Sequence, residues 1–275
     1  MRLVKPDTWI IEPFCPSSDA PRVHLLIGET YALVIDPTDT PYDLRAYIQT
    51  YVTDKPLLVA NTHSHNDHTY ANYLFDDCTI YMSEICQQEL RQARTHPPKL
   101  DALGHAYASY NEGTVVRPGD VIELGGRPVQ VLGCTPCHAA SSLLFLDEKA
   151  GILFTGDEID AGQVNIWNQP VEVFRDNIVM LLGLRDRFDT ICCPHNGTPM
   201  HADVLRYFLE NWSISRYTIP AYYLFLMVGV TGIEPATSWS QTTRAPICAT
   251  PREHLVFLEK TFSISTTRII LQYLI

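Results

Sequence analysis

One stretch, residues 62–68 (THSHNDH), constrains this chain more than any other, because it places three imidazoles and a carboxylate within seven positions. The run before it, residues 56–61 (PLLVAN), is short and apolar with polar residues on either side. Such a run is typical of a buried strand that ends at the edge of a sheet. We therefore expect residues 62–68 to form a loop between a strand and a helix.

The spacing within this loop suits metal binding. His63 and His65 are two positions apart, so on an extended segment their rings leave the same face and can hold one cation together. Asp67 and His68 follow after a turn and can point towards a second cation. Imidazole nitrogens and a carboxylate suit zinc, iron or manganese. A polar loop rich in histidine by chance is the alternative. It is disfavoured because five of the ten histidines lie in this loop or at the two later places where such a site needs them.

Length and charge narrow the classes of function. The chain has 275 residues, is 46% hydrophobic and carries a formal charge of −11. A surface that binds nucleic acid or an anionic membrane needs basic patches, so this charge excludes a broad one and favours a small-molecule substrate. The first residues lack the apolar core of a signal peptide, and no apolar run is long enough to span a bilayer. We expect a cytoplasmic protein with no nucleic-acid or membrane partner; the oligomeric state stays open.

Eight cysteines are many for this length, but they show no regular disulfide spacing. Without a secretory signal, we expect most of them to be reduced and buried. Cys134 and Cys137 have the spacing of a redox or structural-zinc pair, which competes with the histidine-based interpretation. No second pair of this kind completes a site with four thiolates.

The pattern along the chain predicts strands that alternate with helices. Several predicted strands end on a residue that can bind a metal: His138, Asp157 and His195. Strand ends are where α/β proteins place their sites, because a sheet holds such residues rigidly. The expected strands are 9–14, 23–27, 31–36, 56–60, 79–82, two within 115–132, 143–146, 152–155 and 190–193; the expected helices are 41–52, 70–75, 84–94, 173–188 and 202–212.

Together these features resemble the metallo-β-lactamase superfamily of metallohydrolases. The motifs that carry the resemblance stand in the family's order and span residues 1–212: the hairpin that ends at Asp36, residues 62–68 (THSHNDH), Gly119-Asp120, Gly125-Gly126, residues 135–138 (TPCH), residues 154–157 (FTGD) and residues 194–197 (PHNG). The resemblance implies an α/β (α+β) fold, a four-layer αβ/βα sandwich with the ligands on loops along one edge.

The resemblance also implies a metal set and a reaction. One ion would be held by His63, His65 and His138, the other by Asp67, His68 and His195, with Asp157 bridging both. The implied cofactors are two divalent ions, zinc first, with iron or manganese as alternatives. The nucleophile would be a hydroxide between the ions, with Asp67 as the catalytic residue that accepts a proton or passes one to the leaving group.

Asp157 separates branches within this family. True β-lactamases generally lack it, whereas thioesterases, lactonases, phosphodiesterases and sulfur dioxygenases of the fold keep it, and the interval from Asp157 to His195 resembles the glyoxalase II-like branch. We therefore expect a dinuclear hydrolase acting on a small ester, thioester, lactone or phosphodiester. One alternative is a mononuclear iron persulfide dioxygenase that uses His63, His138 and Asp157. Another is an inactive product of a truncated gene.

Two departures from the family pattern lie within and just after residues 135–138. Cys137 stands where the family usually has glycine, which favours a tolerated packing change over a thiol in the metal pocket. Residues 139–142 (AASS) replace a Thr-Pro-Gly-Ser run and leave the ligands unchanged. Six further residues are weak candidates to line the substrate site, and we expect most of them to be surface or packing residues: Tyr70, Asn72, Glu158, Asp160, Trp167 and Arg175.

The last part of the chain, residues 213–275, differs in character from the rest. It carries five Lys and Arg against three Glu, a formal +2 in an otherwise strongly acidic chain, and it continues no family motif. Residues 229–244 resemble a tract that recurs in conceptual translations of non-coding DNA. We predict a metallohydrolase domain over 1–212, followed by an atypical extension whose reading frame is not the native one. A genuine variable extension is the alternative.

Overall fold

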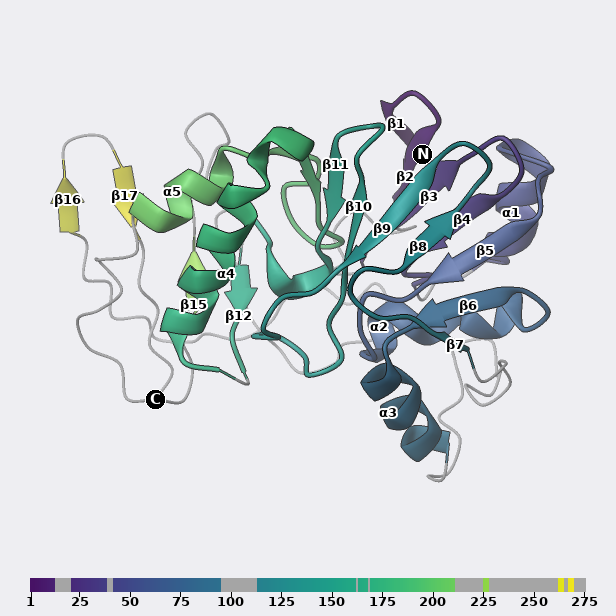
Figure 1. Cartoon of the computed structure of the whole chain (residues 1–275), viewed down its shortest axis with the longest axis horizontal. Coiled ribbons are helices and arrows are strands. Elements are labelled where there is room, and N and C mark those ends of the chain that lie inside the picture. The colour runs from purple at the N-terminus through teal and green to yellow at the C-terminus, as the bar shows by residue number, and fades with distance from the viewer. Residues whose placement is uncertain are drawn as a thin grey trace, which may run out of the picture.

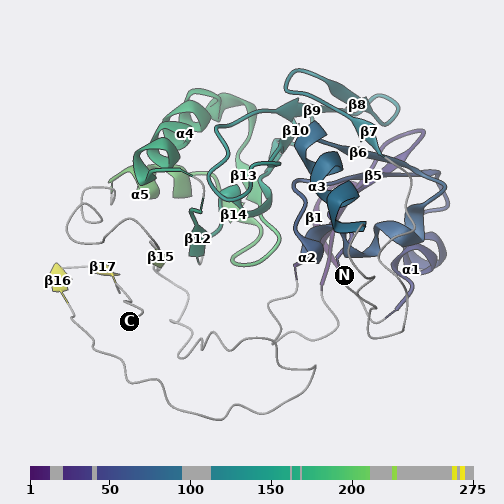
Figure 2. The ribbon, with the colours of Figure 1, turned by 90° about the horizontal axis from the view of Figure 1, so that it is seen from below.

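The structure is a computed structural model. It describes residues 1–12, 21–38, 42–94, 113–161, 163–167 and 169–210, together with three short segments, 225–227, 262–264 and 267–269. Two sheets face each other in the described part, and helices lie on the outer side of each (Figures 1 and 2).

The first sheet has seven strands in the order β1-β2-β3-β4-β5-β6-β7. Its strands β1 to β4 are antiparallel neighbours, whereas β4 to β7 run parallel. Parallel neighbours need a crossover, which α1 (Leu44–Tyr51) provides between β4 and β5. The strands are β1 (Arg2–Lys5), β2 (Thr8–Ile11), β3 (Val23–Ile27), β4 (Ala32–Ile35), β5 (Leu57–Ala60), β6 (Thr79–Met82) and β7 (Thr114–Val115).

The second sheet has six strands in the order β14-β13-β11-β10-β9-β8, and only β11 and β13 of its described neighbours run parallel. The crossover between those two strands is α4 (Val171–Gly183). The strands are β8 (Val121–Glu123), β9 (Pro128–Leu132), β10 (Leu144–Asp147), β11 (Ile152–Phe154), β13 (Thr190–Cys192) and β14 (Met200–His201).

Three apolar clusters separate these layers. Strand β10 shows how one strand serves two of them: Phe145 packs between the two sheets, whereas Leu144 and Leu146 pack towards α4 and α5 (Val204–Glu210). Strand β4 does the same, with Leu33 between the sheets and Val34 towards α1. Side chains that alternate between two buried faces explain the continuous apolar runs in the sequence. The predicted four-layer αβ/βα sandwich is confirmed.

The sequence predicted most elements to within a few residues. The helix expected over 84–94 is α3 (Glu84–Arg94), and the short helix over 70–75 is the 3₁₀ turn η1 (Tyr70–Phe75) after the single turn α2 (Asn66–Thr69). The helix expected over 173–188 is α4, which ends at Gly183 and is followed by the 3₁₀ turn η3 (Arg185–Arg187). Residues 115–132 were expected to form only the second sheet, but β7 pairs with β6 of the first.

The tail is described at three strands only: β15 (Phe225–Met227), β16 (Phe262–Ile264) and β17 (Thr267–Ile269). Strand β15 pairs antiparallel with β12 (Gln163–Asn165), and β16 pairs with β17. The boundary at residue 212 and the tract 229–244 lie outside the described residues, so the prediction of a foreign reading frame stays a prediction. Within the described residues, no helix is both long and apolar enough to cross a membrane.

Candidate metal centre

The loop after β5 presents four candidate ligands from one edge of the first sheet. His63 and His65 leave the extended part of the loop, and their ring centroids lie 4.5 Å apart. Asp67 and His68 follow on α2, and the His68 ring lies 4.0 Å from that of His63. The loop thus brings the His63 ring close to those of both His65 and His68.

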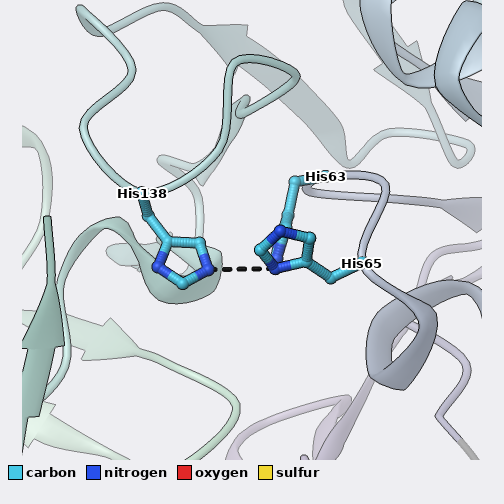
Figure 3. Close-up of side chains that lie close together, drawn as sticks. All are labelled: His63, His65 and His138. Atoms are coloured by element: carbon cyan, nitrogen blue, oxygen red, sulfur yellow. Dashed lines mark hydrogen bonds between the residues drawn. The ribbon is translucent and has the colours of Figure 1, made fainter. Parts of the chain in front are cut away.

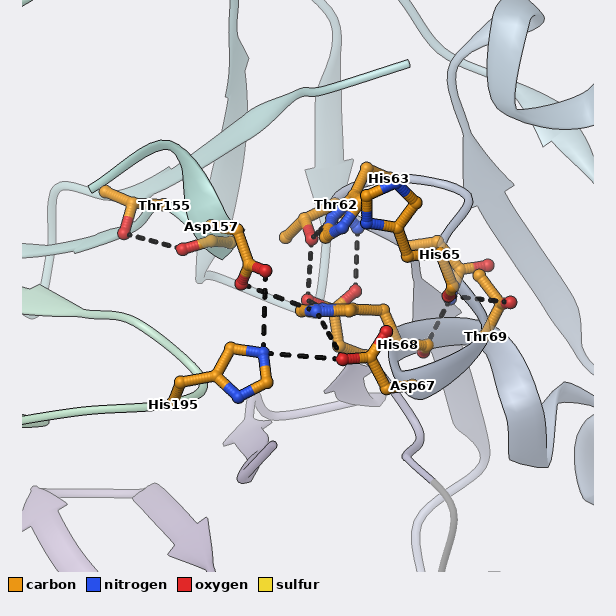
Figure 4. Close-up of polar contacts among 12 residues, drawn as sticks. Thr62, His63, His65, Asp67, His68, Thr69, Thr155, Asp157 and His195 are labelled. Atoms are coloured by element: carbon orange, nitrogen blue, oxygen red, sulfur yellow. Dashed lines mark hydrogen bonds and ion pairs between the residues drawn. The ribbon is translucent and has the colours of Figure 1, made fainter. Parts of the chain in front are cut away.

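Three later residues reach the same place from the second sheet. His138 lies in the loop between β9 and β10, Asp157 in the 3₁₀ turn η2 (Gly156–Glu158) after β11, and His195 just after β13. Figure 3 shows His138 pointing at His65, and Figure 4 shows Asp157 and His195 pointing at Asp67 and His68. Every residue expected as a ligand is thus in the cluster, in three overlapping groups: His63, His65 and His138; His63, His68 and Asp157; Asp67, His68 and His195.

The distances between these side chains are those of ligands that share a cation. His138 Nε2 lies 3.1 Å from His65 Nδ1 and 3.4 Å from Asp157 Oδ2. Asp157 Oδ2 is also 3.5 Å from His195 Nε2, and Asp157 Oδ1 is 3.4 Å from His68 Nε2. Two ligands 2.0–2.1 Å from a tetrahedral zinc stand roughly 3.3 Å apart. Asp157 therefore lies between the imidazoles of both predicted sites.

Neighbouring groups fix which ring nitrogen faces the centre. The Nδ1 atom of His68 lies 3.0 Å from a carboxylate oxygen of Asp36, and that of His138 lies 3.0 Å from the carbonyl oxygen of Asn165. Each acceptor takes the Nδ1 proton, so Nε2 is the ring nitrogen that faces the other ligands. Asp36 also accepts from the backbone N–H and the hydroxyl of Thr62, each at 2.7 Å. One carboxylate thus orients His68 and holds the start of the ligand loop.

The charge balance differs across the cluster. Burial lowers the pKa of His63 well below its usual value and also lowers the pKa of His65 and His138. Burial acts in the same direction on His68 and His195, but nearby carboxylates, Asp157 first, outweigh it and raise the pKa of both imidazoles. In return, these imidazoles lower the pKa of Asp157 and bring that of Asp67 to about 2, although burial opposes both shifts. The carboxylate side of the cluster therefore attracts positive charge.

The residues fit a bound metal. His63 Nε2, His68 Nε2 and Asp157 Oδ1 are buried atoms that make no hydrogen bond among the described residues, although the last two face each other as an ion pair at 3.4 Å. A buried polar atom without a hydrogen bond costs on the order of 1–3 kcal/mol, so such a cluster favours a bound ligand. The same three residues form one of the groups whose ligand atoms lie within 4.8 Å of one another. A cation at this place would satisfy all three atoms.

The backbone beside the centre is constrained. Gly156 has a φ of +52°, and a Cβ there would lie 2.5 Å from Thr62 Oγ1. Only glycine avoids both the strain and the clash. Asp36 also has a positive φ, 54°, which a residue with a side chain adopts at a cost. That cost is offset by the three bonds that its carboxylate makes.

Comparison with known proteins identifies the family. Residues 20–168 match the family model described as the metallo-beta-lactamase superfamily. The chain belongs to this superfamily. Among the curated members that match are acyl-coenzyme A thioesterases MBLAC2 of Homo sapiens, 26% identical over 183 residues, and of Gallus gallus, 27% identical over 180 residues. Each match covers 58% of this chain and 65% of the relative, so the chain spans just under two thirds of the relatives' length.

Solved structures share the fold at low sequence identity. The metallo-beta-lactamase from Pontibacter korlensis is 14% identical, with a TM-score of 0.57 over 76% of this chain and 96% of its own. The protein TTHA1623, solved in a di-iron-bound form, is 23% identical, with a TM-score of 0.55 over 70% of this chain and 97% of its own. Likeness at this level confirms the predicted sandwich and says nothing further about chemistry.

The departures from the family pattern have structural explanations. Cys137 is fully buried, adopts no positive φ, and its thiol lies 3.4 Å from both the Asn177 amide and the Thr135 carbonyl oxygen. Among the described residues, no cysteine belongs to a group that can hold a metal. Its place in the apolar cluster beside α4 supports the favoured packing role; none of the six described cysteines forms a disulfide, and four of them are buried. Cys15 and Cys248 lie outside the described residues.

The weak substrate candidates divide into three kinds. Asn72 is buried and exchanges hydrogen bonds with Asn61, and Arg175 pairs with Asp176, so both are the packing or surface residues expected. Glu158 and Asp160 are each 3% exposed and bind backbone N–H groups near the ligands. Trp167 alone is largely exposed while lying beside His138, with ring centroids 6.5 Å apart. These different roles depend on tertiary contacts that no local sequence pattern indicates.

Proposed function

We propose that this chain is a metal-dependent hydrolase with two divalent ions that cleaves a thioester. The observation that carries the proposal is the convergence of two ligand groups on Asp157, whose Oδ2 lies between His138 and His195. One ion would be held by His63, His65 and His138 and the other by Asp67, His68 and His195, with Asp157 between them. The donor set of imidazoles and carboxylates favours zinc, with iron or manganese as alternatives.

The substrate class rests on the curated relatives. They are named acyl-coenzyme A thioesterases, and each match covers 58% of this chain. A thioester therefore comes first among the ester, thioester, lactone and phosphodiester substrates that the motifs allow. The acidic chain also supports a small-molecule partner and argues against nucleic acid.

The chain's own residues have two tasks in this reaction. Metal ions bound here would supply a water of lowered pKa and polarise the carbonyl oxygen. Asp67 Oδ2 lies 3.5 Å from His195 Nε2, and 48% of the Asp67 side chain is exposed. Its pKa of about 2 makes it a carboxylate at neutral pH, so Oδ2 is available to accept a hydrogen bond from the nucleophile, and we assign to it the passage of a proton to the leaving group. Asp36 and the Asn165 carbonyl keep the protons of His68 and His138 away from the centre.

Metal content per chain is the first test. Full-length protein purified without a chelator or a His-tag is analysed for zinc, iron and manganese, beside His63→Ala and Asp157→Ala. We expect two equivalents in the wild type and losses in both variants. A folded wild-type protein without metal would overturn the proposal, and one equivalent of iron alone would move it to the persulfide dioxygenase.

The second experiment tests the substrate. Hydrolysis of acyl-coenzyme A is monitored through the free thiol that it releases. We expect turnover that is lost on removal of the metal and returns with zinc. Oxygen uptake with a thiol persulfide would instead support the dioxygenase. Two bound zinc ions with neither activity would support the third interpretation, a folded but inactive product.

A further inference from the structure

The turn that carries Asp157 also carries two buried carboxylates, Glu158 and Asp160, each 3% exposed. Burying a carboxylate is costly unless hydrogen bonds compensate for the lost water. The turn itself is held by Thr155, whose hydroxyl donates to the Ile159 carbonyl at 2.9 Å and whose N–H donates to the Cys192 carbonyl at 3.1 Å. Both carboxylates therefore project from a fixed point at the end of β11.

Glu158 holds the loop that carries His138. The N–H groups of Cys137 and His138 donate to its carboxylate oxygens at 3.0 Å each, and the Ser142 hydroxyl donates from the far end of the same loop. This loop has no helix or strand between β9 and β10. The bonds to Glu158 take the place of those that a regular element would supply.

Asp160 does the same for the loop that carries His195. The N–H of Asn196 donates to Asp160 Oδ2 at 3.0 Å. From the opposite side, the Arg22 backbone N–H donates to the Pro194 carbonyl at 2.8 Å, and the Arg22 guanidinium donates to the His195 carbonyl. The His195 peptide thus lies between a cation that binds its carbonyl and an anion that binds the next N–H.

We infer that Glu158 and Asp160 are positioning residues, each serving one of the two metal sites. Glu158 sets the place of His138 in the His63–His65–His138 group, and Asp160 sets the place of His195 in the Asp67–His68–His195 group. The inference rests on the proposed dinuclear centre. It predicts that loss of Glu158 weakens one metal site and that loss of Asp160, two positions later on the same turn, weakens the other.

The physical reason is preorganisation. A ligand on an unsupported loop must be ordered when the metal binds, and that entropy is subtracted from the affinity. Charge-assisted bonds to backbone N–H groups order the loop in advance. Because the two carboxylates bond to different loops, loss of either one should weaken chiefly one site.

The test uses full-length protein with Glu158→Gln or Asp160→Asn, which keep the size of the side chain and remove its charge. Asp147→Asn is the matched control, because Asp147 is also a fully buried carboxylate but pairs with Arg127, away from the centre. Zinc affinities come from competition with a chelator. ¹⁵N-histidine NMR reports which imidazoles respond at one equivalent of zinc.

We expect Glu158→Gln to weaken the site that contains His138 by about tenfold or more, so that His68 and His195 respond first. Asp160→Asn should weaken the site that contains His195 to a similar extent, so that His63 and His138 respond first. Asp147→Asn should leave the order of filling as in the wild type. A wild type that binds two zinc ions, with both variants filling in the wild-type order, would overturn the inference while the proposed function stands.

A second measurement on the wild type alone is independent of how the variants fold and of how many ions bind. Hydrogen exchange of the metal-free protein should show protected amides at Cys137, His138 and Asn196, although these residues lie outside any helix or strand. Exchange of these amides at the rate of an open loop would show that the carboxylates hold nothing, and the inference would fail whether or not zinc binds.

Discussion

His63, His65, Asp67 and His68 reach the metal centre from one loop of the first sheet, whereas His138, Asp157 and His195 arrive on three separate loops of the second. The four from one loop are placed relative to one another by the geometry of a few consecutive residues. The other three depend on contacts between segments that are distant in sequence. We call the four ligands from residues 62–68 the contiguous half of the centre, and His138, Asp157 and His195 the dispersed half. The contiguous half can be predicted from local spacing, whereas the dispersed half is sensitive to changes elsewhere in the fold.

The variant with the largest expected effect on stability is at Arg127, which joins the two sheets. Its guanidinium donates to Asp147 in the second sheet, and to the Asp7 and Ile27 carbonyls and the Thr8 hydroxyl in the first. Because Arg127 is 5% exposed and Asp147 is fully buried, Arg127→Met leaves a buried carboxylate without its cation. We expect a loss of about 3–5 kcal/mol in the free energy of unfolding, measured with urea.

A double variant separates the charge from the packing. Arg127→Met combined with Asp147→Leu removes both charges, and a buried pair replaced by apolar side chains is often tolerated. Part of the stability should return, although the carbonyls of Asp7 and Ile27 still lose the hydrogen bond that Arg127 donates. If the single variant is as stable as the wild type, the sheets are held together without this residue.

The pH dependence of stability tests a second contact between the sheets. His24 on β3 is 2% exposed, and its ring lies 5.3 Å from that of Phe154 on β11. Burial first, and the charge of Arg22 second, lower the pKa of His24 from 6.5 to about 3. Below pH 6.5 the unfolded chain takes up a proton that the folded protein does not. The stability that neutral His24 provides is therefore lost as the pH falls from 6.5 towards 3.

The loss should reach about 2 kcal/mol at pH 5, since each unit below 6.5 is worth about 1.4 kcal/mol. The measurement compares the free energy of unfolding at pH 7 and pH 5 for the wild type and His24→Leu. The variant should lose about 2 kcal/mol less than the wild type over this range. Equal losses would show that His24 does not resist protonation in the folded state.

Asp36 tests the contiguous half directly. Asp36→Asn replaces one acceptor oxygen by an NH₂ group, which then faces either the Thr62 N–H or the His68 Nδ1 proton. We expect zinc affinity to fall about tenfold, equivalent to about 1.4 kcal/mol, as for other groups that orient a metal-binding histidine. Asp43→Asn is the control, since Asp43 only caps α1 by accepting from the Ala46 N–H. An affinity loss of the same size in the control would count against this role of Asp36.

The difference between the halves also explains how far the sequence could go. Residues 62–68 could be predicted as part of a metal site, because the strand, the spacing and the types of ligand are all visible in one short stretch of sequence. His138, Asp157 and His195 were found as residues at strand ends within family motifs. The roles of Glu158, Asp160 and Arg127 were not visible, because each side chain binds groups that only the folded chain brings near.

Short strands were not predicted for a similar reason. Strand β14 is two residues long and β12 is three, too short for a period of two to stand out. Strand β7, also two residues, was assigned to the second sheet because it leads into β8. Its pairing with β6 of the first sheet depends on tertiary contacts. In contrast, α3 was placed correctly at both ends, because eleven residues are enough for a helical pattern to be read.

Trp167 offers the smallest and most specific test, at the exposed rim of the dispersed half. Its backbone N–H donates to the Cys137 carbonyl at 2.9 Å, and 53% of the residue is exposed beside His138. An aromatic face next to the proposed reaction centre can bind an apolar part of the substrate. We expect Trp167→Ala to raise KM for an acyl-coenzyme A by about fivefold, roughly 1 kcal/mol, with kcat nearly unchanged. Trp167→Phe should recover most of the binding. A fall in kcat at constant KM would instead show that Trp167 acts through the position of His138, as a further support of the dispersed half.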